Sequence, residues 1–192
     1  MKKRILTIFF LLFASIPLSA QNTSIGFCAG QWQPHSIELQ KTVSLFAGNA
    51  ETTPYFSLIV TEGLAKTIFL KQSIGFWKQK FVYSKNVRSV TLVPVTAAIK
   101  HRLVSDSFFM PCVSYGAGLL FGIPKKEPKT TVTPPKSIGI DIFVATGFDI
   151  AFSKAIGFHM DFSYHYAKFS SNVGDTDDFT GPQAILGLYY GF

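Results

Sequence analysis

The stretch "AIGFHMDFSYHYAKF", residues 155–169, alternates between apolar side chains and small or polar ones. One parity carries Ile156, Phe158, Met160, Phe162, Tyr164 and Tyr166, and the other carries Gly157, His159, Asp161, Ser163, His165 and Ala167. A period of two residues is typical of a β-strand, whose successive side chains point to opposite faces. Six consecutive matches therefore predict a strand with one apolar face.

The same alternation recurs on both sides of this stretch. Residues 137–152, "SIGIDIFVATGFDIAF", come directly before it, and the short "SKA" between the two predicts an antiparallel hairpin. The chain ends in "AILGLYYGF", residues 184–192, where Ala184, Leu186, Leu188, Tyr190 and Phe192 share one parity. Further strands are expected at 54–62, 66–83, 87–103 and 109–122.

Composition indicates where such strands would lie. The chain is 47% hydrophobic and contains 20 Phe among 192 residues, yet no apolar run beyond residue 17 approaches the roughly 18 residues that a transmembrane helix needs. Because lipid cannot hydrogen-bond to the backbone, the other structure that spans a bilayer is a closed β-barrel with apolar residues outside. The pattern predicts such a barrel.

The first twenty residues have the features of a cleaved signal peptide. Lys2, Lys3 and Arg4 precede an apolar run from 5 to 16, and 18–20 form a plausible cleavage site. We therefore expect an exported chain whose single domain is residues 21–192. Without the signal, 15 Lys and Arg stand against 11 Asp and Glu, so the net charge is +4 and no nucleic-acid partner is expected.

Counting strands leaves one ambiguity near the N-terminus. Residues 23–32 and 36–48 both alternate, which gives nine candidates, whereas bacterial single-chain barrels have even strand numbers. Within the region 22–47, one segment is then an arm of a loop hairpin, or the two form one bent strand. We predict an all-β fold, an eight-stranded antiparallel transmembrane β-barrel with up-and-down meander topology. The stretches 66–83 and 87–101 exceed the length needed to span. Their excess, around 78–88, is expected either to rise above the membrane as a two-stranded ribbon or to be taken up by a greater tilt or a bent, inturned hairpin.

Several segments together resemble a known family. They are the signal segment, "VTLVPVTAAIKHRL" (90–103), "MPCVSYGAGLLFGI" (110–123), "GFHMDFSYHYAKF" (157–169) and "LGLYYGF" (186–192). The chain resembles the small porin-like outer-membrane β-barrel proteins of Gram-negative bacteria, the broad OmpA/OmpX-type group. The resemblance implies export through the periplasm to the outer membrane, contact with outer-membrane lipid and lipopolysaccharide, and an assembly signal at Leu188, Tyr190 and Phe192 that is read by the barrel-assembly machinery.

Polar residues of the inward parity are the candidate site. They are Asp141, Asp149, His159, Asp161, Ser163 and His165. Acyl transfer needs a nucleophile, a base and an orienting carboxylate in contact. Residues two apart on one strand face are about 6.5 to 7 Å apart, so contact along the strand is marginal and cross-strand pairing would serve better. The favoured interpretation is a lumenal network in which these groups, with Glu62, Lys71 and Lys100, neutralise one another.

These observations predict a non-enzymatic integral outer-membrane protein with a structural, adhesive or envelope-interaction role through its extracellular loops, which could bind a host or cell-surface ligand. The alternative is a narrow pore or a lipid-acting enzyme that uses the lumenal polar residues. No cofactor and no metal are expected, since "GDTDD" (174–178) lacks the spacing of a calcium loop. Cys28 and Cys112 are expected to be buried thiols, although export would permit a disulfide.

Overall fold

The computed structural model describes residues 23–35, 50–52, 54–83, 86–105, 107–124, 137–173 and 176–192. The predicted signal peptide and the candidate strand at 36–48 lie outside these ranges. Within the ranges, no helix has the length and hydropathy needed to cross a membrane.

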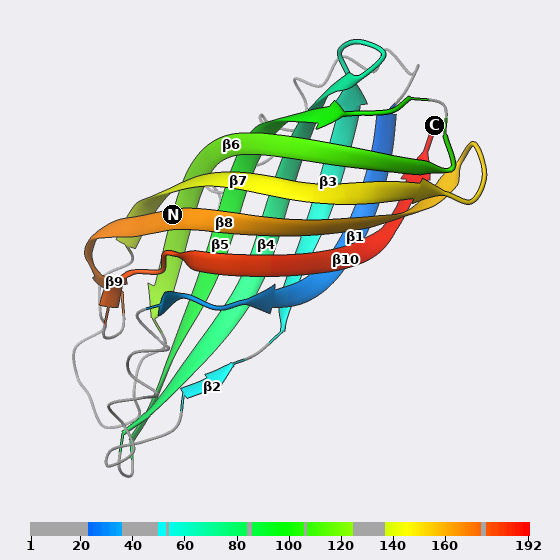
Figure 1. Cartoon of the computed structure of the whole chain (residues 1–192). Helices are drawn as coiled ribbons and strands as arrows, with labels where there is room; N and C mark the ends of the chain where they lie inside the picture. Colours follow the sequence, from blue (N-terminus) through cyan, green and yellow to red (C-terminus); the bar gives the residue numbers. More distant parts are fainter. Residues whose placement is uncertain are drawn as a thin grey trace.

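Eight long strands form a closed antiparallel barrel (Figure 1). They are β1 (Thr23–Trp32), β3 (Tyr55–Gly63), β4 (Ile68–Tyr83), β5 (Asn86–Arg102), β6 (Phe109–Pro124), β7 (Ser137–Ala151), β8 (Ile156–Val173) and β10 (Gly181–Gly191). Two short strands are added at the edges: β2 (Ala50–Thr52) pairs with β4, and β9 (Thr176–Asp178) pairs with β8. The predicted eight-stranded meander is confirmed, and residues 23–32 are its first strand.

The last strand closes the barrel. β10 pairs with β1 from Ser24 opposite Gly191 to Trp32 opposite Gln183, and on its other side it pairs with β8. Beyond the strand, the Phe192 N–H donates to the Thr23 carbonyl at 2.8 Å. Both ends of the described chain are thereby held in the wall, and no edge is left along β1 or β10.

The connections separate the two ends of the barrel. Short turns at 64–67, 103–108 and 152–155 lie at one end, which we call the turn end, together with Thr23 and Phe192. We call the opposite end the loop end. The hairpin between β7 and β8 is confirmed, since the N–H groups of Phe152 and Ser153 both donate to the Ile156 carbonyl at 3.0 Å.

Side chains follow the predicted parity. On the outward parity, Val144 is 61% exposed and Leu188 is 60% exposed, whereas the inward Asp141 is fully buried. Cys28 and Cys112 are both inward, buried and unbridged, as expected. The outer surface is therefore apolar and the interior is filled by side chains, which is the arrangement of a barrel in lipid.

A ribbon extends from the loop end (Figure 1). Pairing between β5 and β6 ends at Val90 opposite Pro124, whereas β4 and β5 stay paired as far as Tyr83 opposite Asn86. The predicted two-stranded ribbon is present. Its third strand, β2, which pairs with β4 over residues 79–81, was not predicted.

If the outward side chains face lipid, the loss of folding free energy caused by an added charge should depend on the depth of that residue in the bilayer. Val144→Arg, at the middle of β7, should destabilise the folded protein by roughly 2 to 4 kcal/mol, because the guanidinium would face the bilayer centre. Phe152→Arg, equally exposed but at the turn end, should cost about 0 to 1 kcal/mol. Folding titrations into lipid vesicles measure both, and equal costs would contradict the assigned lipid-facing surface.

Candidate functional site

The inward row of β8 divides the lumen into three layers. From the turn end, the row reads His159 and Asp161, then Ser163 and His165, and then the apolar residues of 167–173. Each pair of polar residues has partners on the neighbouring strands, so the sequence of this one strand orders the whole interior.

The layer nearest the turn end is a charged cluster. It consists of Lys71, Lys100, Arg102, Asp149, His159 and Asp161. Lys100 Nζ lies 2.7 Å from both carboxylate oxygens of Asp149, and Arg102 Nη2 lies 3.0 Å from one of them. Lys71 forms an ion pair with Asp161. Buried charges persist only when they are paired and hydrogen-bonded, and here the pairs are direct.

His159 connects the two ion pairs of the charged cluster. Its Nδ1 lies 2.7 Å from Asp149 Oδ1, and its Nε2 lies 2.9 Å from Asp161 Oδ2. A cavity of only about 20 Å³ adjoins His159, Lys100 and Cys28, which is room for about one water molecule. The cluster is therefore a packed network and leaves no space for a substrate beside it.

The prediction for Glu62 was wrong. Odd-numbered residues of β3 face the lumen, so Glu62 has the outward parity and is half-exposed near the turn end. Arg102 contacts Asp149 instead, and sequence reasoning missed it although it shares the parity of Lys100 on β5. The guanidinium also lies 4.2 Å from the centre of the Phe69 ring, which gives it a second contact.

The middle layer brings together Asp141, Ser163 and His165. Ser163 Oγ lies 3.0 Å from His165 Nε2, and His165 Nδ1 lies 2.9 Å from Asp141 Oδ1. The expectation that contact along one strand is marginal was wrong for Ser163 and His165, as it was for His159 and Asp161, because the side chains of each pair lean toward each other. The imidazole also packs against Phe143 and Trp32, with ring centroids at 5.0 and 5.3 Å.

This connectivity is the one that serine acyl transfer uses, with the hydroxyl on one imidazole nitrogen and the carboxylate on the other. The site has no access along the lumen, because both ends are blocked. On the turn-end side stands the buried charged cluster. On the loop-end side stands an apolar plug of fully or nearly fully buried side chains, namely Trp32, Trp77, Leu92, Leu120, Phe169 and Phe179.

Aromatic contacts hold the apolar plug together. Trp32 and Trp77 lie 5.5 Å apart between ring centroids, and Phe179 lies 6.3 Å from Trp77 and 5.6 Å from Phe169. Sequence reasoning missed this layer, although Trp32 and Trp77 do have the inward parity of their strands. The plug closes the lumen at the loop end.

No group of His, Cys, Asp and Glu in the part of the chain that the structure describes could hold a metal ion. Of the carboxylates in "GDTDD", Asp178 serves a local turn, because the Thr180 N–H donates to its Oδ1 at 2.8 Å. Burial acts to raise the pKa of Asp178, but the hydrogen bonds from Thr180 hold it below its ordinary value.

The three residues of the expected assembly signal lie on the outer surface of β10. Leu188, Tyr190 and Phe192 are 60, 50 and 66% exposed, and the last two rings meet edge to face at 5.3 Å between centroids. They form an apolar stripe that reaches the turn end.

Three solved structures share this architecture, and one of them is an outer-membrane protein by name. Neisserial surface protein A aligns with a TM-score of 0.58 at 11% identity, over 89% of this chain and 97% of that one. The outer membrane protein OprG from Pseudomonas aeruginosa gives 0.57 at 13% identity, over 90 and 96%. The N-terminal β-barrel domain of Pseudomonas aeruginosa OprF gives 0.51 at 10% identity, over 90 and 98%.

The chain has the fold of the small outer-membrane β-barrels. The resemblance that the sequence predicted is thus confirmed for the fold. No protein-family model matches the sequence, and no curated protein is a significant match. Identities of 10 to 13% carry no information about single residues, so the site of this outer-membrane barrel fold is interpreted from its own geometry.

The charged cluster predicts an asymmetry between single and double substitutions. Lys71→Met should destabilise the barrel by about 3 to 5 kcal/mol, because it removes the cation that is paired with the buried Asp161. Lys71→Met combined with Asp161→Leu should recover most of that loss, since no uncompensated charge remains. Urea unfolding in vesicles measures both, and a double variant as unstable as the single one would contradict the pairing.

Proposed function

We propose that this protein is a non-enzymatic integral outer-membrane barrel that presents its β2–β4–β5 ribbon to the outside of the cell for adhesion or another envelope interaction. Its fold supports the location, since one of the solved structures of this fold is an outer-membrane protein by name. The other three connections at the loop end are longer than the turns at the opposite end, although only two residues join β4 to β5. This difference supports the orientation, because such barrels have short periplasmic turns and long extracellular loops. The loop end then faces outward.

The packed lumen supports an anchoring role over the alternative of a pore or enzyme. Eight strands enclose an interior that side chains can just fill. Here the apolar plug, the Ser163–His165–Asp141 layer and the charged cluster follow one another across it, and their side chains are almost all buried. An open aqueous path or a lumenal substrate would need these layers to separate.

The ribbon is the observation that carries the proposal. Among the strands that the structure describes, none pairs with β5 on the side away from β4 between residues 86 and 89. An exposed strand edge offers unpaired N–H and C=O groups to an extended segment of another chain. This mode of binding needs no pocket, which fits a protein whose interior is filled.

The lipid-facing surface and the C-terminal stripe complete the proposal. The apolar outer wall would contact outer-membrane lipid and lipopolysaccharide. The barrel-assembly machinery would read Leu188, Tyr190 and Phe192 during insertion. A host or cell-surface ligand would meet the ribbon after insertion.

Shortening the ribbon should abolish adhesion and leave the barrel intact. Replacing residues 81–88 with Asn-Gly joins Lys80 to Ser89, which are cross-strand partners, through a two-residue hairpin turn. Cells that carry this variant should attach to cultured host-cell monolayers no better than cells without the protein. Attachment is counted after washing, and outer-membrane levels are compared by heat-modifiable gel shift.

The matched control replaces residues 125–132, also eight residues, with Asn-Gly. This control should attach like the wild type, and a loss confined to it would transfer the role from the ribbon to residues 125–132, which contain three lysines and one glutamate. Labelling of Asn86→Cys on whole cells with an impermeant maleimide tests the orientation separately, because both native cysteines are buried.

Removing the terminal ring should impair insertion more than stability. Phe192→Ala should lower the outer-membrane level and leave protein in the periplasm, while the purified variant still refolds in detergent, because a closed barrel survives the loss of one exposed ring. Phe152→Ala is the control, since that Phe is 61% exposed at the same end but lies outside the last strand. Equal cellular levels of the two variants would show that the signal is not at Phe192.

A further inference from the structure

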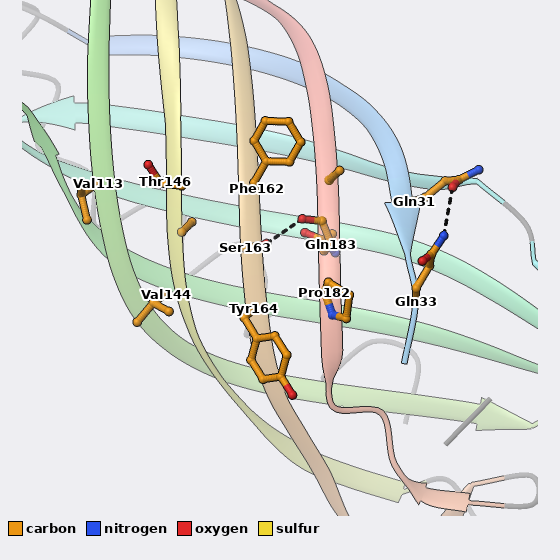
Figure 2. Close-up of a pocket in the computed structure, with 12 residues that line it drawn as sticks. Gln31, Gln33, Val113, Val144, Thr146, Phe162, Ser163, Tyr164, Pro182 and Gln183 are labelled. Carbon is orange, nitrogen blue, oxygen red and sulfur yellow. Dashed lines mark hydrogen bonds between the residues drawn. The ribbon is translucent and has the colours of Figure 1, made fainter. Parts of the chain in front are cut away.

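The outer wall of the barrel contains a hollow that the proposed adhesive role does not use. Its volume is about 580 Å³, and it lies across β7, β8 and β10 and extends to β6 and β1 (Figure 2). Phe162 and Tyr164 of β8 border it, with Thr146 on one side and Pro182 and Ala184 on the other. The lining is predominantly apolar, and most of its residues have the outward parity.

Strand register explains why the hollow forms here. Phe162 is paired with Ala184 on β10 and with Thr146 on β7. A large ring on the central strand thus stands between small side chains on both neighbours, and the wall is recessed on either side of it. Three inward residues, Ala145, Ser163 and Gln183, also line the hollow, and the Ser163 hydroxyl is bonded to His165 on the lumen side.

A polar rim lies toward the loop end of the hollow. Gln31 and Gln33 point outward from β1 and the residues after it, with Gln33 Nε2 3.5 Å from Gln31 Oε1 (Figure 2). His35 Nε2 lies 3.1 Å from the Tyr164 hydroxyl, and the two rings pack at 5.8 Å between centroids. This contact joins the segment after β1 to β8 across the end of β10.

Glycine makes that crossing possible. A Cβ at Gly181 would collide with the Gln33 carbonyl and with Pro34 Cα, which lies 2.7 Å away, so only glycine lets residues 33–35 lie this close to β10. The position of the rim is therefore fixed by the packing of residues 33–35 against β10.

The rim and the hollow together have amphipathic character. Exposed amide side chains are unfavourable against hydrocarbon unless they find polar partners, and here they adjoin the apolar hollow directly. Amide and phenol groups supply uncharged donors for oxygen acceptors. A ligand with an apolar chain and an oxygen-rich head satisfies both parts.

We propose that this hollow binds one acyl chain of an outer-leaflet glycolipid, whose sugar and phosphate oxygens accept hydrogen bonds from Gln31, Gln33 and the rim at His35 and Tyr164. The assignment to the outer leaflet rests on the proposed orientation, in which the loop end faces outward. Binding at this site is saturable and specific, unlike the exchange of lipids around the rest of the barrel.

Native mass spectrometry of the refolded protein in detergent, titrated with hexa-acylated lipid A or with phosphatidylethanolamine, tests the proposal. Wild type should retain one lipid A in preference to phosphatidylethanolamine. Ala184→Phe, which fills the hollow, should lose that retained lipid. Ala117→Phe, the same substitution on the outer surface of β6, should keep it. Equal retention by both variants would overturn the proposal and leave only annular lipid.

Two further variants keep the test decisive. If Ala184→Phe fails to fold, Thr146→Phe fills the hollow from β7, with the same loss expected. Gln31→Leu combined with Gln33→Leu should still bind an acyl chain but lose the preference for lipid A, and an unchanged preference would overturn the role of the rim. The measurement uses purified protein, so it is independent of cell attachment and labelling at Asn86, which test the proposed function.

Discussion

Lipid offers no hydrogen-bond partner to a peptide group, and the rest of this structure depends on that constraint. Every spanning strand must have a neighbour on both sides, so the first and last strands must find each other. β10 does this by pairing with both β1 and β8, and the Phe192 N–H extends the pairing beyond the strand. Once the wall is closed, the apolar side chains of each strand face lipid, and the side chains of the other parity must fit into a narrow interior.

That interior has too little room for water to hydrate its charged groups. The charged groups therefore pair with one another, and the interior is divided into layers. Lys71 and Lys100 meet Asp161 and Asp149 directly, and His159 joins the pairs. In the next layer, Ser163, His165 and Asp141 have the connectivity of a catalytic triad but no access along the lumen. The apolar plug then completes the filling. A Ser–His–Asp arrangement can thus serve to satisfy the hydrogen bonds of buried polar groups.

Features that can meet a partner are therefore on the outside. The ribbon continues the sheet past the end of the barrel, where a strand edge is no longer protected by its neighbour. The hollow arises because the wall carries large and small side chains in adjacent register, next to a rim held in place at Gly181. The first feature suits an extended chain and the second suits an acyl chain, so the two could act independently.

Sequence by itself determined the strands, their two faces and the closure of the barrel, because a period of two residues is a local property that survives in any β-sheet environment. The inward placement of Asp141, Asp149, His159 and Asp161 followed from the same parity. Which inward groups touch was decided by the tertiary structure. Contacts such as Arg102 with Asp149, the exclusion of Glu62, and the approach of Ser163 to His165 depend on the stagger between strands and on how side chains lean. The plug, the third strand of the ribbon and the hollow depend on register between segments far apart in the chain, and parity within one strand carries no information about register between strands.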